Sequence, residues 1–511
     1  MRRPWDLVLN VERNAALPPF LQIARALTED IQRGRLRPGD ALPGSRRLAA
    51  SLGVHRNTVL AALAELMAEG WIETTPSRGT FVTRAIPDHR GRPFSSQLGI
   101  RARVPSCPLF VLPEAPAAYR PPVLPRGTLN LSSGAPDVRL VPARLIGRAY
   151  RRVLGLRGAK LLAYGDPEGH PALRSALASM LTNTRGLSVA ADDVLITRGS
   201  QMALTLTARA LLRPGDTVAV EEFGYRPAWE AFRSAGATVV PVPIDADGID
   251  VDALKRLAQR TALRAIYVTP HHQYPTTVTL KAARRLALLT LARAERIAII
   301  EDDYDHEFHY DGRPVLPLAS ADHTGLVVYI GTLSKILAPG LRIGYIVAPP
   351  PVLGSVSAIR SLLDIQGDLA TEAAVAALIE DGELQRHIAR VRRVYANRRE
   401  ILANSLRRVF GDGVEFTLAA GGMALWVRLC MAADVEAWAR RSVENGVSWY
   451  TGRRYAFDGQ PRPFARFSFA WLNERELPEA VKRMAAALPS RRSAPNAPVR
   501  NRSNPNAQSG S

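Results

Sequence analysis

One lysine of this chain occupies a position where its chemistry could matter. Residues 332–345 read TLSKILAPGLRIGY and follow the apolar run LVVYIG. Of the 67 lysines and arginines only five are lysines, so arginine is the usual cation here. A lysine, unlike an arginine, can lose its proton near neutral pH and form a Schiff base. Lys335 is the candidate, because the other four lysines lie in patterns typical of solvated helix faces or loop ends.

Pyridoxal phosphate is a cofactor that forms such a Schiff base, and it places four demands on its site. The pyridine nitrogen needs a carboxylate, the ring a stacking partner, the phenolic oxygen a donor, and the phosphate needs amides, hydroxyls and a cation. In the second part of the chain, apolar runs that predict strands alternate with helical patterns, which indicates a largely parallel sheet covered on both faces. Such folds bind ligands where strands end, so the candidate ligands follow these runs.

Two strand ends offer partners for the ring of the cofactor. The run IAIIEDDYDHEF ends in acid, and Asp302 would keep the pyridine nitrogen protonated while Tyr304 would donate to the phenolic oxygen. The alternative is an acidic strand end that is simply solvated. In VAVEEFGYRPAW, Tyr225 lies just beyond another predicted strand and would stack on the ring. An aromatic residue at such a position belongs more often to a core, so Tyr225 alone is a weak signal.

Other segments could hold the phosphate. In TRGSQMALTLTARALL, a turn between strand and helix leaves free amides at the helix N-terminus, which suits an anion. Its candidate ligands are Ser200 and Gln201, although turns of this kind are common. The lysine segment adds two hydroxyls and a cation that can neutralise the phosphate, namely Thr332, Ser334 and Arg342.

The N-terminal region predicts a different module. The segments LQIARALTEDIQRG, SRRLAASLGV and HRNTVLAALAELMAEG have apolar residues at helical spacing and end at Gly34, Gly53 and Gly70. The segment WIETTPSRGTFV then predicts two strands joined by a turn. Two helices separated by a tight turn have the spacing of a helix-turn-helix, and the hairpin would be its wing.

In such a module the third helix lies in the major groove of DNA, with its N-terminal residues at the base edges. Those residues are His55, Arg56, Asn57 and Thr58, and arginine and asparagine can read guanine and adenine. Three further residues are placed to reach phosphates or the minor groove, namely Arg46, Arg78 and Thr80. The alternative is a solvated helical hairpin with incidental arginines.

Length and composition limit the class of protein. A chain of 511 residues is too long for one core and suggests two or three domains. The formal charge of +20 favours a polyanionic partner such as nucleic acid, although the preference for arginine also fits a compositional bias of the genome. Cys107 and Cys430 cannot form a disulfide framework. With no signal-peptide core and no apolar run of spanning length, we expect a cytoplasmic protein.

The same patterns divide the chain into four parts. Residues 15–84 form the predicted winged helix-turn-helix, and residues 85–127 form a linker rich in proline and arginine. Residues 128–488 form the α/β domain, which becomes mainly helical after about Leu353 and so predicts a smaller C-terminal subdomain. Residues 489–511 are polar and rich in proline, asparagine and serine, and we expect them to be disordered.

The N-terminal region resembles the winged-helix domain of the GntR regulators. The matching segments are LPGSRRLAASLGVHRNTV, AELMAEGWI and RGTFV, which together cover most of the domain. One departure is Ser77, which stands where the wing of the family usually has glycine. The conformation of the wing turn is therefore the point at which this chain could differ from the family.

The α/β region, from about Leu129 to Leu488, resembles the aminotransferases of fold type I. The resemblance rests on an ordered series of motifs: YGDPEGHPALR, RGSQ, EEFGY, TPHHQYPT, EDDY and TLSKILAPGLRIGY. It implies pyridoxal phosphate as cofactor, with Lys335 as the residue that bonds to it. It also implies that Tyr164 contacts the phosphate bound by a neighbouring subunit, and that Arg466, in ARFSFA, binds the carboxylate of an amino acid.

The two parts together resemble the MocR-type regulators of the GntR family. This resemblance covers nearly the whole chain and implies a transcription factor that uses pyridoxal phosphate, alone or with an amino acid, as its effector. It also implies a homodimer, commonly with the winged helices exchanged between subunits. Two residues depart from the group, Phe223 where proline is usual and Thr277 where glycine is usual. The segment YRPAW offers no clear second arginine for a distal carboxylate, so we assign no γ-amino-acid ligand.

Three functions are consistent with these residues. The first is a regulator that binds double-stranded DNA and responds to pyridoxal phosphate or an amino acid. The second is a true aminotransferase with a DNA-binding appendage, because Lys335 could also move the α-proton of an amino acid. The third is a regulator whose large domain has lost the cofactor, which the intact set of cofactor residues disfavours. The predicted recognition helix favours the first function, and no metal site is expected.

Overall fold

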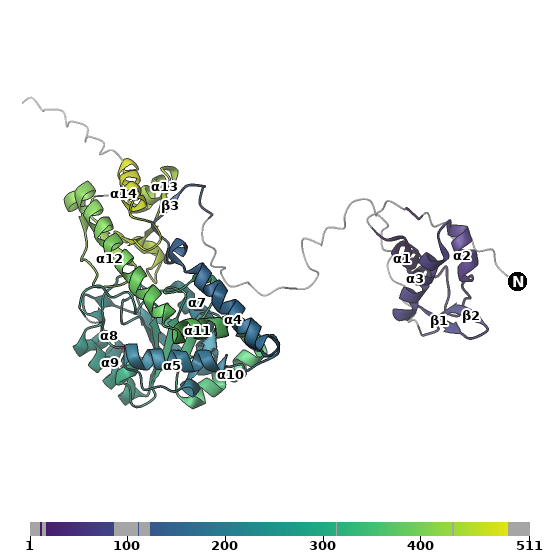
Figure 1. Cartoon of the computed structure of the whole chain (residues 1–511), viewed down its shortest axis with the longest axis horizontal. Helices are drawn as coiled ribbons and strands as arrows, with labels where there is room; N and C mark the ends of the chain where they lie inside the picture. The colour runs from purple at the N-terminus through teal and green to yellow at the C-terminus, as the bar shows by residue number, and fades with distance from the viewer. Residues whose placement is uncertain are drawn as a thin grey trace, which may run out of the picture. The chain divides into compact units, whose positions relative to one another are not determined.

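The computed structural model describes residues 11–12, 17–85, 111, 123–312, 314–431 and 434–488. The chain divides into two compact units, Met1–Pro113 and Glu114–Ser511, and each is described by itself (Figure 1). The division falls within the predicted linker. Most of that linker, the predicted disordered tail and Cys107 lie outside the described residues. Among the described residues, no helix is both long and apolar enough to cross a membrane.

Within residues 17–85, the first unit has three helices and one hairpin, as the sequence predicts. The helices are α1 (Pro19–Gln32), α2 (Ser45–Leu52) and α3 (Arg56–Ala68). The antiparallel hairpin of β1 (Ile72–Thr75) and β2 (Gly79–Val82) pairs Ile72 with Val82. Apolar residues at helical spacing meet in one core, and its fully buried members include Ile23, Leu27, Val59 and Leu66.

Glycines end the helices of this unit, as predicted. Gly53 caps α2 in the left-handed conformation with φ 63°, which allows the sharp turn into α3. Gly34 and Gly70, just beyond α1 and α3, have φ values of 70° and 77°. The helix-turn-helix spacing therefore rests on backbone conformations that glycine adopts without steric cost.

The second unit is built on a seven-stranded sheet, within residues 194–347, of order β4-β12-β11-β10-β9-β5-β6. The strands are β4 (Val194–Thr197), β5 (Thr217–Glu221), β6 (Thr238–Val242), β9 (Leu263–Val268), β10 (Ala298–Asp303), β11 (Val327–Thr332) and β12 (Gly344–Val347). All are parallel except β12, which runs antiparallel to β11 and β4. The prediction of a largely parallel sheet is confirmed, although the sequence patterns named neither β6 nor β12.

Alternate residues along these strands face opposite layers of helices. Val218 and Val220 pack with α6 (Ser200–Leu211), α7 (Arg226–Ser234) and α10 (Pro350–Leu363) in one core. Their neighbour Ala219 belongs to a second core on the other face, with α8 (Val251–Arg260) and α9 (Ala282–Glu295). This period of two on a sheet buried on both sides explains why its strands are almost wholly apolar.

The remaining elements complete the second unit around a third core, and Figure 1 shows the long helix α12 beside them. The helices are α4 (Ala143–Leu161), α5 (Pro171–Arg185), α11 (Leu369–Glu380), α12 (Glu383–Phe410), α13 (Val435–Glu444) and α14 (Glu476–Ala486). A four-stranded sheet of order β13-β14-β17-β16 contains β13 (Val414–Glu415), β14 (Ala424–Leu429), β17 (Phe464–Ser468) and β16 (Tyr450–Thr451). Short pairs join β3 (Leu129–Asn130) to β15 (Val447–Ser448) and β7 (Ile244–Asp245) to β8 (Gly248–Ile249).

Candidate functional site

The carboxyl ends of the parallel strands bring the predicted cofactor residues to one edge of the large sheet. Asp302 lies near the end of β10, Lys335 follows β11, and Ser200 begins α6 after β4. Tyr225 lies in the connection between β5 and α7. The shared direction of the parallel strands therefore brings together residues that are more than 100 positions apart in the chain.

A cavity of about 910 Å³ opens at this edge. Its wall includes seven of the predicted cofactor residues, namely Ser200, Gln201, Tyr225, Thr332, Ser334, Lys335 and Arg342. Cavities of roughly 300–1,000 Å³ are typical of sites for small molecules and cofactors. The sequence motifs thus converge on one space large enough for a cofactor.

Lys335 is half-buried in the wall of this cavity, and its ammonium group donates a hydrogen bond to the carbonyl oxygen of Gly134 at 2.9 Å. Burial, followed by the nearby charge of Arg466, lowers the pKa of Lys335 to about 8, although Asp305 and Asp302 oppose the shift. A fraction of Lys335 is therefore neutral at physiological pH, and the neutral amine is the nucleophile.

Asp302 is buried near Lys335, although it does not line the cavity. Tyr267 donates a hydrogen bond to its Oδ2 at 2.9 Å, whereas its Oδ1 has no partner among the described residues. Burial raises the pKa of Asp302 to about 7, although the hydrogen bond from Tyr267 and the charge of Lys335 oppose this shift. A cationic ring nitrogen at the free oxygen would stabilise the carboxylate and satisfy this atom.

Neither Tyr304 nor Arg466 lines the cavity, although Arg466 lies near enough to Lys335 to lower its pKa. The hydroxyl of Tyr304 donates to the carbonyl of His272 at 2.9 Å, so in this conformation it is not turned toward a ligand. Arg466, on β17, is only 2% exposed, and its guanidinium lies 5.0 Å from the centre of the Tyr274 ring. Its Nε and Nη1 lack partners among the described residues, which leaves a buried cation suited to a carboxylate.

The phosphate end of the cavity is built around the start of α6. Gly199 precedes that helix with φ 79°, and the guanidinium of Arg342 lies so close that a Cβ on Gly199 would be 2.9 Å from it. Arg342 donates to the carbonyl of Arg198 at 2.9 Å. The hydroxyl of Ser334 and the Oε1 of Gln201 are buried without partners in the described part of the chain. Amides, a hydroxyl and a cation thus meet where an anion would be stabilised.

These unpaired polar atoms test whether the site fits pyridoxal phosphate. Buried polar atoms are rarely left without partners, so each one calls for an explanation. Those of Asp302, Ser334, Gln201 and Arg466 match a ring nitrogen, a phosphate and a substrate carboxylate, and a lysine with a lowered pKa stands among them. The residues present therefore fit this cofactor.

Tyr164 is separate from the other predicted residues. Its side chain is 84% exposed in the single chain, and it does not line the cavity. The expectation that it contacts a phosphate in another subunit is therefore not tested by one chain.

The site also contains residues that the sequence patterns did not single out. Gly134 accepts from Lys335 across 201 positions of sequence, and Tyr267 donates to Asp302. Glu221 accepts from Thr269 at 2.9 Å and from Gln273 at 3.1 Å, and burial raises its pKa to about 7. Tyr267 and Glu221 could have been found from the sequence, because each is a polar or acidic residue within a predicted buried strand. No local sequence pattern distinguishes Gly134.

The two departures from the family pattern have different surroundings. Thr277 has φ 62°, the left-handed region that glycine adopts readily and a β-branched residue does not. Phe223 makes an edge contact with the Trp426 ring at 5.9 Å between centroids and forms a bridge with Ala456. The threonine therefore leaves backbone strain beside the cavity, while the phenylalanine adds a packing contact.

In the first unit, the predicted DNA-contacting residues lie at the start of α3 and on the wing. His55 is the N-cap of α3, and its Nδ1 accepts from the amide of Asn57 at 3.3 Å. Arg56 and Asn57 are exposed, Thr58 is half-buried, and Arg56 donates to the hydroxyl of Ser45 at 3.3 Å. Two arginines, Arg46 on α2 and Arg78 in the wing turn, are exposed, and Thr80 on β2 is half-buried. Ser77 in that turn has φ 64°, so the wing keeps a conformation that favours glycine.

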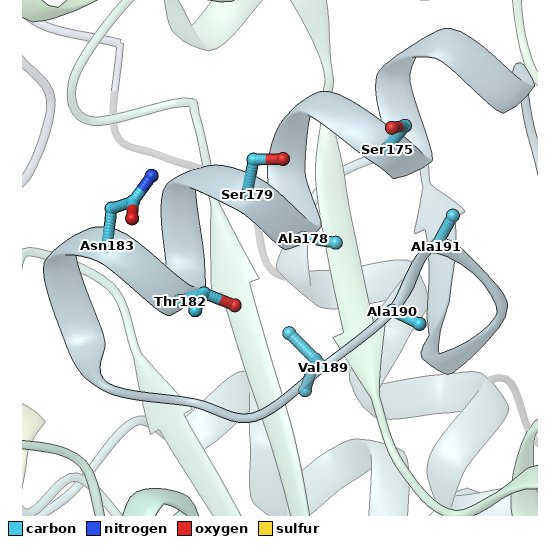
Figure 2. A pocket seen from close by; sticks show the side chains of 8 residues that line it. All are labelled: Ser175, Ala178, Ser179, Thr182, Asn183, Val189, Ala190 and Ala191. Carbon is cyan, nitrogen blue, oxygen red and sulfur yellow. The ribbon is translucent and has the colours of Figure 1, made fainter.

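A second depression lies between α5 and residues 189–191, and Figure 2 shows its lining side chains. They are small or uncharged: Ser175, Ala178, Ser179, Thr182, Asn183, Val189, Ala190 and Ala191. Because none of them is a titratable group, this depression offers no acid, base or charged ligand for chemistry.

Comparisons with known proteins agree with both units. The family "Aminotransferase class I and II" matches residues 126–484, and "Bacterial regulatory proteins, gntR family" matches residues 19–82. The probable rhizopine catabolism regulatory protein MocR of Rhizobium meliloti is 31% identical over 490 residues, covering 94% of this chain and 96% of that protein. The HTH-type transcriptional regulator TauR of Rhodobacter capsulatus is 33% identical over 483 residues, covering 91% and 96%.

A solved structure supports the fold of the second unit. The α-aminoadipate aminotransferase LysN of Thermus thermophilus, complexed with a phosphopyridoxyl-leucine, has a TM-score of 0.67 and 30% sequence identity. The match covers 71% of this chain and 92% of that chain. The fold and the site thus define a winged helix-turn-helix protein joined to a domain of the fold-type I aminotransferase class. The chain belongs to the MocR-type transcriptional regulators of the GntR family.

Proposed function

We propose that this transcriptional regulator binds pyridoxal phosphate through Lys335 and that occupancy of this site changes its affinity for an operator in double-stranded DNA. One observation supports this proposal above the others. The described residues leave several buried polar atoms unpaired around a lysine of lowered pKa, beside a cavity of cofactor size, in a chain that also carries a winged helix. Cofactor binding and DNA binding can therefore be coupled within the same chain.

Each residue of the proposed site has a physical task. When bound, pyridoxal phosphate supplies an electrophilic aldehyde and an electron-withdrawing ring. Lys335 would hold the cofactor through its amine at the aldehyde carbon, and Asp302 would accept a hydrogen bond from the protonated ring nitrogen. Tyr225 would stack on the ring, and the hydroxyl of Tyr304, which now donates to the His272 carbonyl, would donate to the phenolic oxygen. The phosphate would be held by the amides at the start of α6 and by Ser200, Gln201, Thr332, Ser334 and Arg342.

An α-amino acid is the second ligand class that we propose. Arg466 is a buried cation with two unpaired nitrogen atoms, and it lies near enough to Lys335 to lower its pKa. A carboxylate at Arg466 would place the amino group of the ligand toward Lys335. For such a ligand to regulate, it must bind two conformations with different free energies, typically by ~1–3 kcal/mol.

We further propose that the active form is a homodimer in which the winged helices are exchanged between subunits. Apolar side chains on the surface of one chain support an interface. Leu156 and Leu162, near Tyr164, are 78% and 79% exposed, and Leu362 is 89% exposed. Sedimentation velocity should show a particle of two chains, and a particle of one chain at micromolar concentration would contradict this proposal.

Trapping the lysine bond tests the cofactor proposal. The full-length protein is incubated with pyridoxal phosphate, reduced with borohydride, digested and analysed by mass spectrometry. We expect a phosphopyridoxyl group on Lys335 and none after Lys335→Ala, while Lys281→Ala, a matched change outside the site, should retain it. Labelling of several lysines without preference for Lys335 would show that the site does not bind the cofactor specifically.

The second candidate function is catalysis of amino transfer. Lys335 is a half-buried amine of lowered pKa near Arg466 and Asp302, so it could both hold the cofactor and move a proton. Incubation with pyridoxal phosphate, a mixture of amino acids and 2-oxoglutarate separates the two functions. We expect only slow transfer of amino groups, because in a chain with a winged helix the proposed role of the site is to bind a ligand that changes DNA affinity. Rapid turnover that Lys335→Ala abolishes would favour the enzyme.

A further inference from the structure

Four of the nine histidines of the chain lie together beside the cavity. His271 and His272 follow β9, and His306 and His309 follow β10. The ring of His271 is stacked on that of His306, with 4.4 Å between centroids, and lies 4.3 Å from the ring of His272. Such a concentration of imidazoles does not follow from the cofactor chemistry described above.

Three of these rings present nitrogen atoms to one another. One ring nitrogen from each of His271, His272 and His309 lies within 4.8 Å of the nitrogens of the other two. His271 and His272 are buried, and His309 is half-buried. The cluster is therefore enclosed on most sides, and His309 leaves a route by which a small ion could enter.

The ring nitrogens of this group lack the partners that buried imidazoles normally have. Both nitrogens of His271, Nε2 of His272 and Nδ1 of His309 are buried without hydrogen bonds to any residue that the structure describes. A neutral imidazole has one donor and one acceptor, and leaving them unpaired in a protein interior is unfavourable.

A carboxylate orients one of these rings as in known metal sites. Nδ1 of His272 lies 2.8 Å from Oδ1 of Asp305. A donor hydrogen on Nδ1 leaves the lone pair on Nε2, which is the unpaired nitrogen. Histidine ligands of metals commonly donate a hydrogen bond from their second ring nitrogen to a carboxylate in this way. The negative charge of Asp305 would also offset part of the charge of an ion.

We propose that His271, His272 and His309 bind a divalent transition-metal ion of the zinc class. Imidazole ligands suit zinc, copper and nickel, and three histidines plus a water molecule complete a tetrahedral shell. Zinc–nitrogen bonds of ~2.0–2.1 Å place two ligand atoms of a tetrahedron about 3.4 Å apart. The separations here are all within 4.8 Å, so small side-chain rotations can bring the nitrogens to these distances when the ion binds.

The ion would act on the neighbouring cofactor site through one contact. The carbonyl of His272 accepts the hydrogen bond of Tyr304 at 2.9 Å. Binding of an ion to the ring of His272 would therefore hold the backbone that positions Tyr304. This gives the histidine cluster a positioning role beside the site rather than a direct part in its chemistry.

Zinc titration of the full-length protein tests the proposal. The protein carries no histidine tag, is first treated with a chelator, and is then titrated with zinc against a competing coloured chelator. We expect one tightly bound zinc ion per chain. His309→Gln should weaken binding more than tenfold, and Asp305→Asn should weaken it by about 10–100-fold because the orientation of His272 is lost. His323→Gln, at an exposed histidine outside the cluster, should have no effect.

Two results would overturn the proposal. One is a wild-type protein that binds no zinc ion tightly, and the other is an affinity that His309→Gln leaves unchanged. X-ray absorption of the zinc-loaded wild type gives a test that does not depend on the folding of any variant. We expect scattering from three imidazoles, and a first shell with fewer than two would contradict the assignment.

Discussion

At the scale of single residues, Lys335 shows how burial prepares a side chain for chemistry. An ordinary lysine has a pKa of 10.5 and is almost fully protonated at neutral pH. Removal of the ammonium group from water disfavours its charged form, and the positive charge of Arg466 adds to this effect. The same guanidinium that would bind a carboxylate thus also keeps Lys335 reactive.

The pH dependence of Lys335 labelling follows from these charges. Only the neutral amine attacks an aldehyde, so the rate of borohydride-trapped labelling by pyridoxal phosphate should rise with pH and level off above about 8. Arg466→Gln removes a cation that disfavours protonation, so it should raise the pKa of Lys335 and move the midpoint to higher pH. Arg440→Gln, at an exposed arginine on α13, is the control. A midpoint that both variants leave unchanged would contradict the role assigned to Arg466.

At the scale of elements, two turns carry residues that their backbone disfavours. Ser77 in the wing and Thr277 beside the cavity have φ values of 64° and 62°. Comparison with the family pattern had singled out both positions, because glycine is usual there. Both turns adopt a backbone conformation typical of glycine, although neither residue is glycine. The surrounding strands and loops therefore stabilise these strained conformations.

Thr277→Gly should therefore stabilise the second unit. Relief of a left-handed non-glycine residue contributes roughly 1–2 kcal/mol, and the greater freedom of glycine in the unfolded chain offsets roughly 0.5–1 kcal/mol of it. Thr261→Gly is the matched control, because Thr261 ends α8 with an ordinary φ of −144°. Urea unfolding should show a higher midpoint for Thr277→Gly and a lower one for Thr261→Gly. A lower midpoint for both would show that Thr277 is not strained.

The recognition helix makes a separate prediction about DNA. Arg56 and Asn57 are exposed at the start of α3, where they would meet base edges. Replacement of either by alanine should cost ~1–3 kcal/mol of binding to a fragment from upstream of its own gene, with little change for random DNA. Fluorescence anisotropy at fixed salt measures both affinities.

Two further arginines serve as comparisons in that experiment. Arg78→Ala in the wing should weaken binding to both DNAs alike, because a phosphate contact carries no sequence information. Arg25→Ala on α1 should leave both affinities unchanged, because this exposed arginine lies outside the predicted interface. If Arg56→Ala lowered the affinity for specific and for random DNA equally, Arg56 would contact phosphates rather than bases.

At the scale of the whole molecule, the sequence predicted the structural elements that local residue patterns encode. Helical spacing, terminal glycines and apolar strands gave the winged helix and the parallel sheet, and strand-end motifs gave most of the cavity wall. Contacts between distant segments were not predictable in this way. Gly134 meets Lys335 across 201 positions, and β12 follows the lysine segment as a short antiparallel strand. The histidine cluster was also missed, because its members come from two loops that only the sheet brings together.

The central claim also concerns the whole molecule: one chain links a cofactor site to a DNA-binding domain. The cofactor residues lie in the second unit and the recognition helix in the first. A ligand can control DNA binding only if it has different affinities for the DNA-binding and the non-binding conformation. The claim therefore predicts a change in DNA affinity that depends on the cofactor and on Lys335.

The most direct measurement is the affinity of the full-length protein for its own upstream DNA, with and without pyridoxal phosphate, in the wild type and in Lys335→Ala. We predict that the cofactor changes the wild-type affinity by about 5–150-fold, which corresponds to ~1–3 kcal/mol of coupling, and leaves the variant unchanged. Equal wild-type affinities with and without the cofactor would contradict the account.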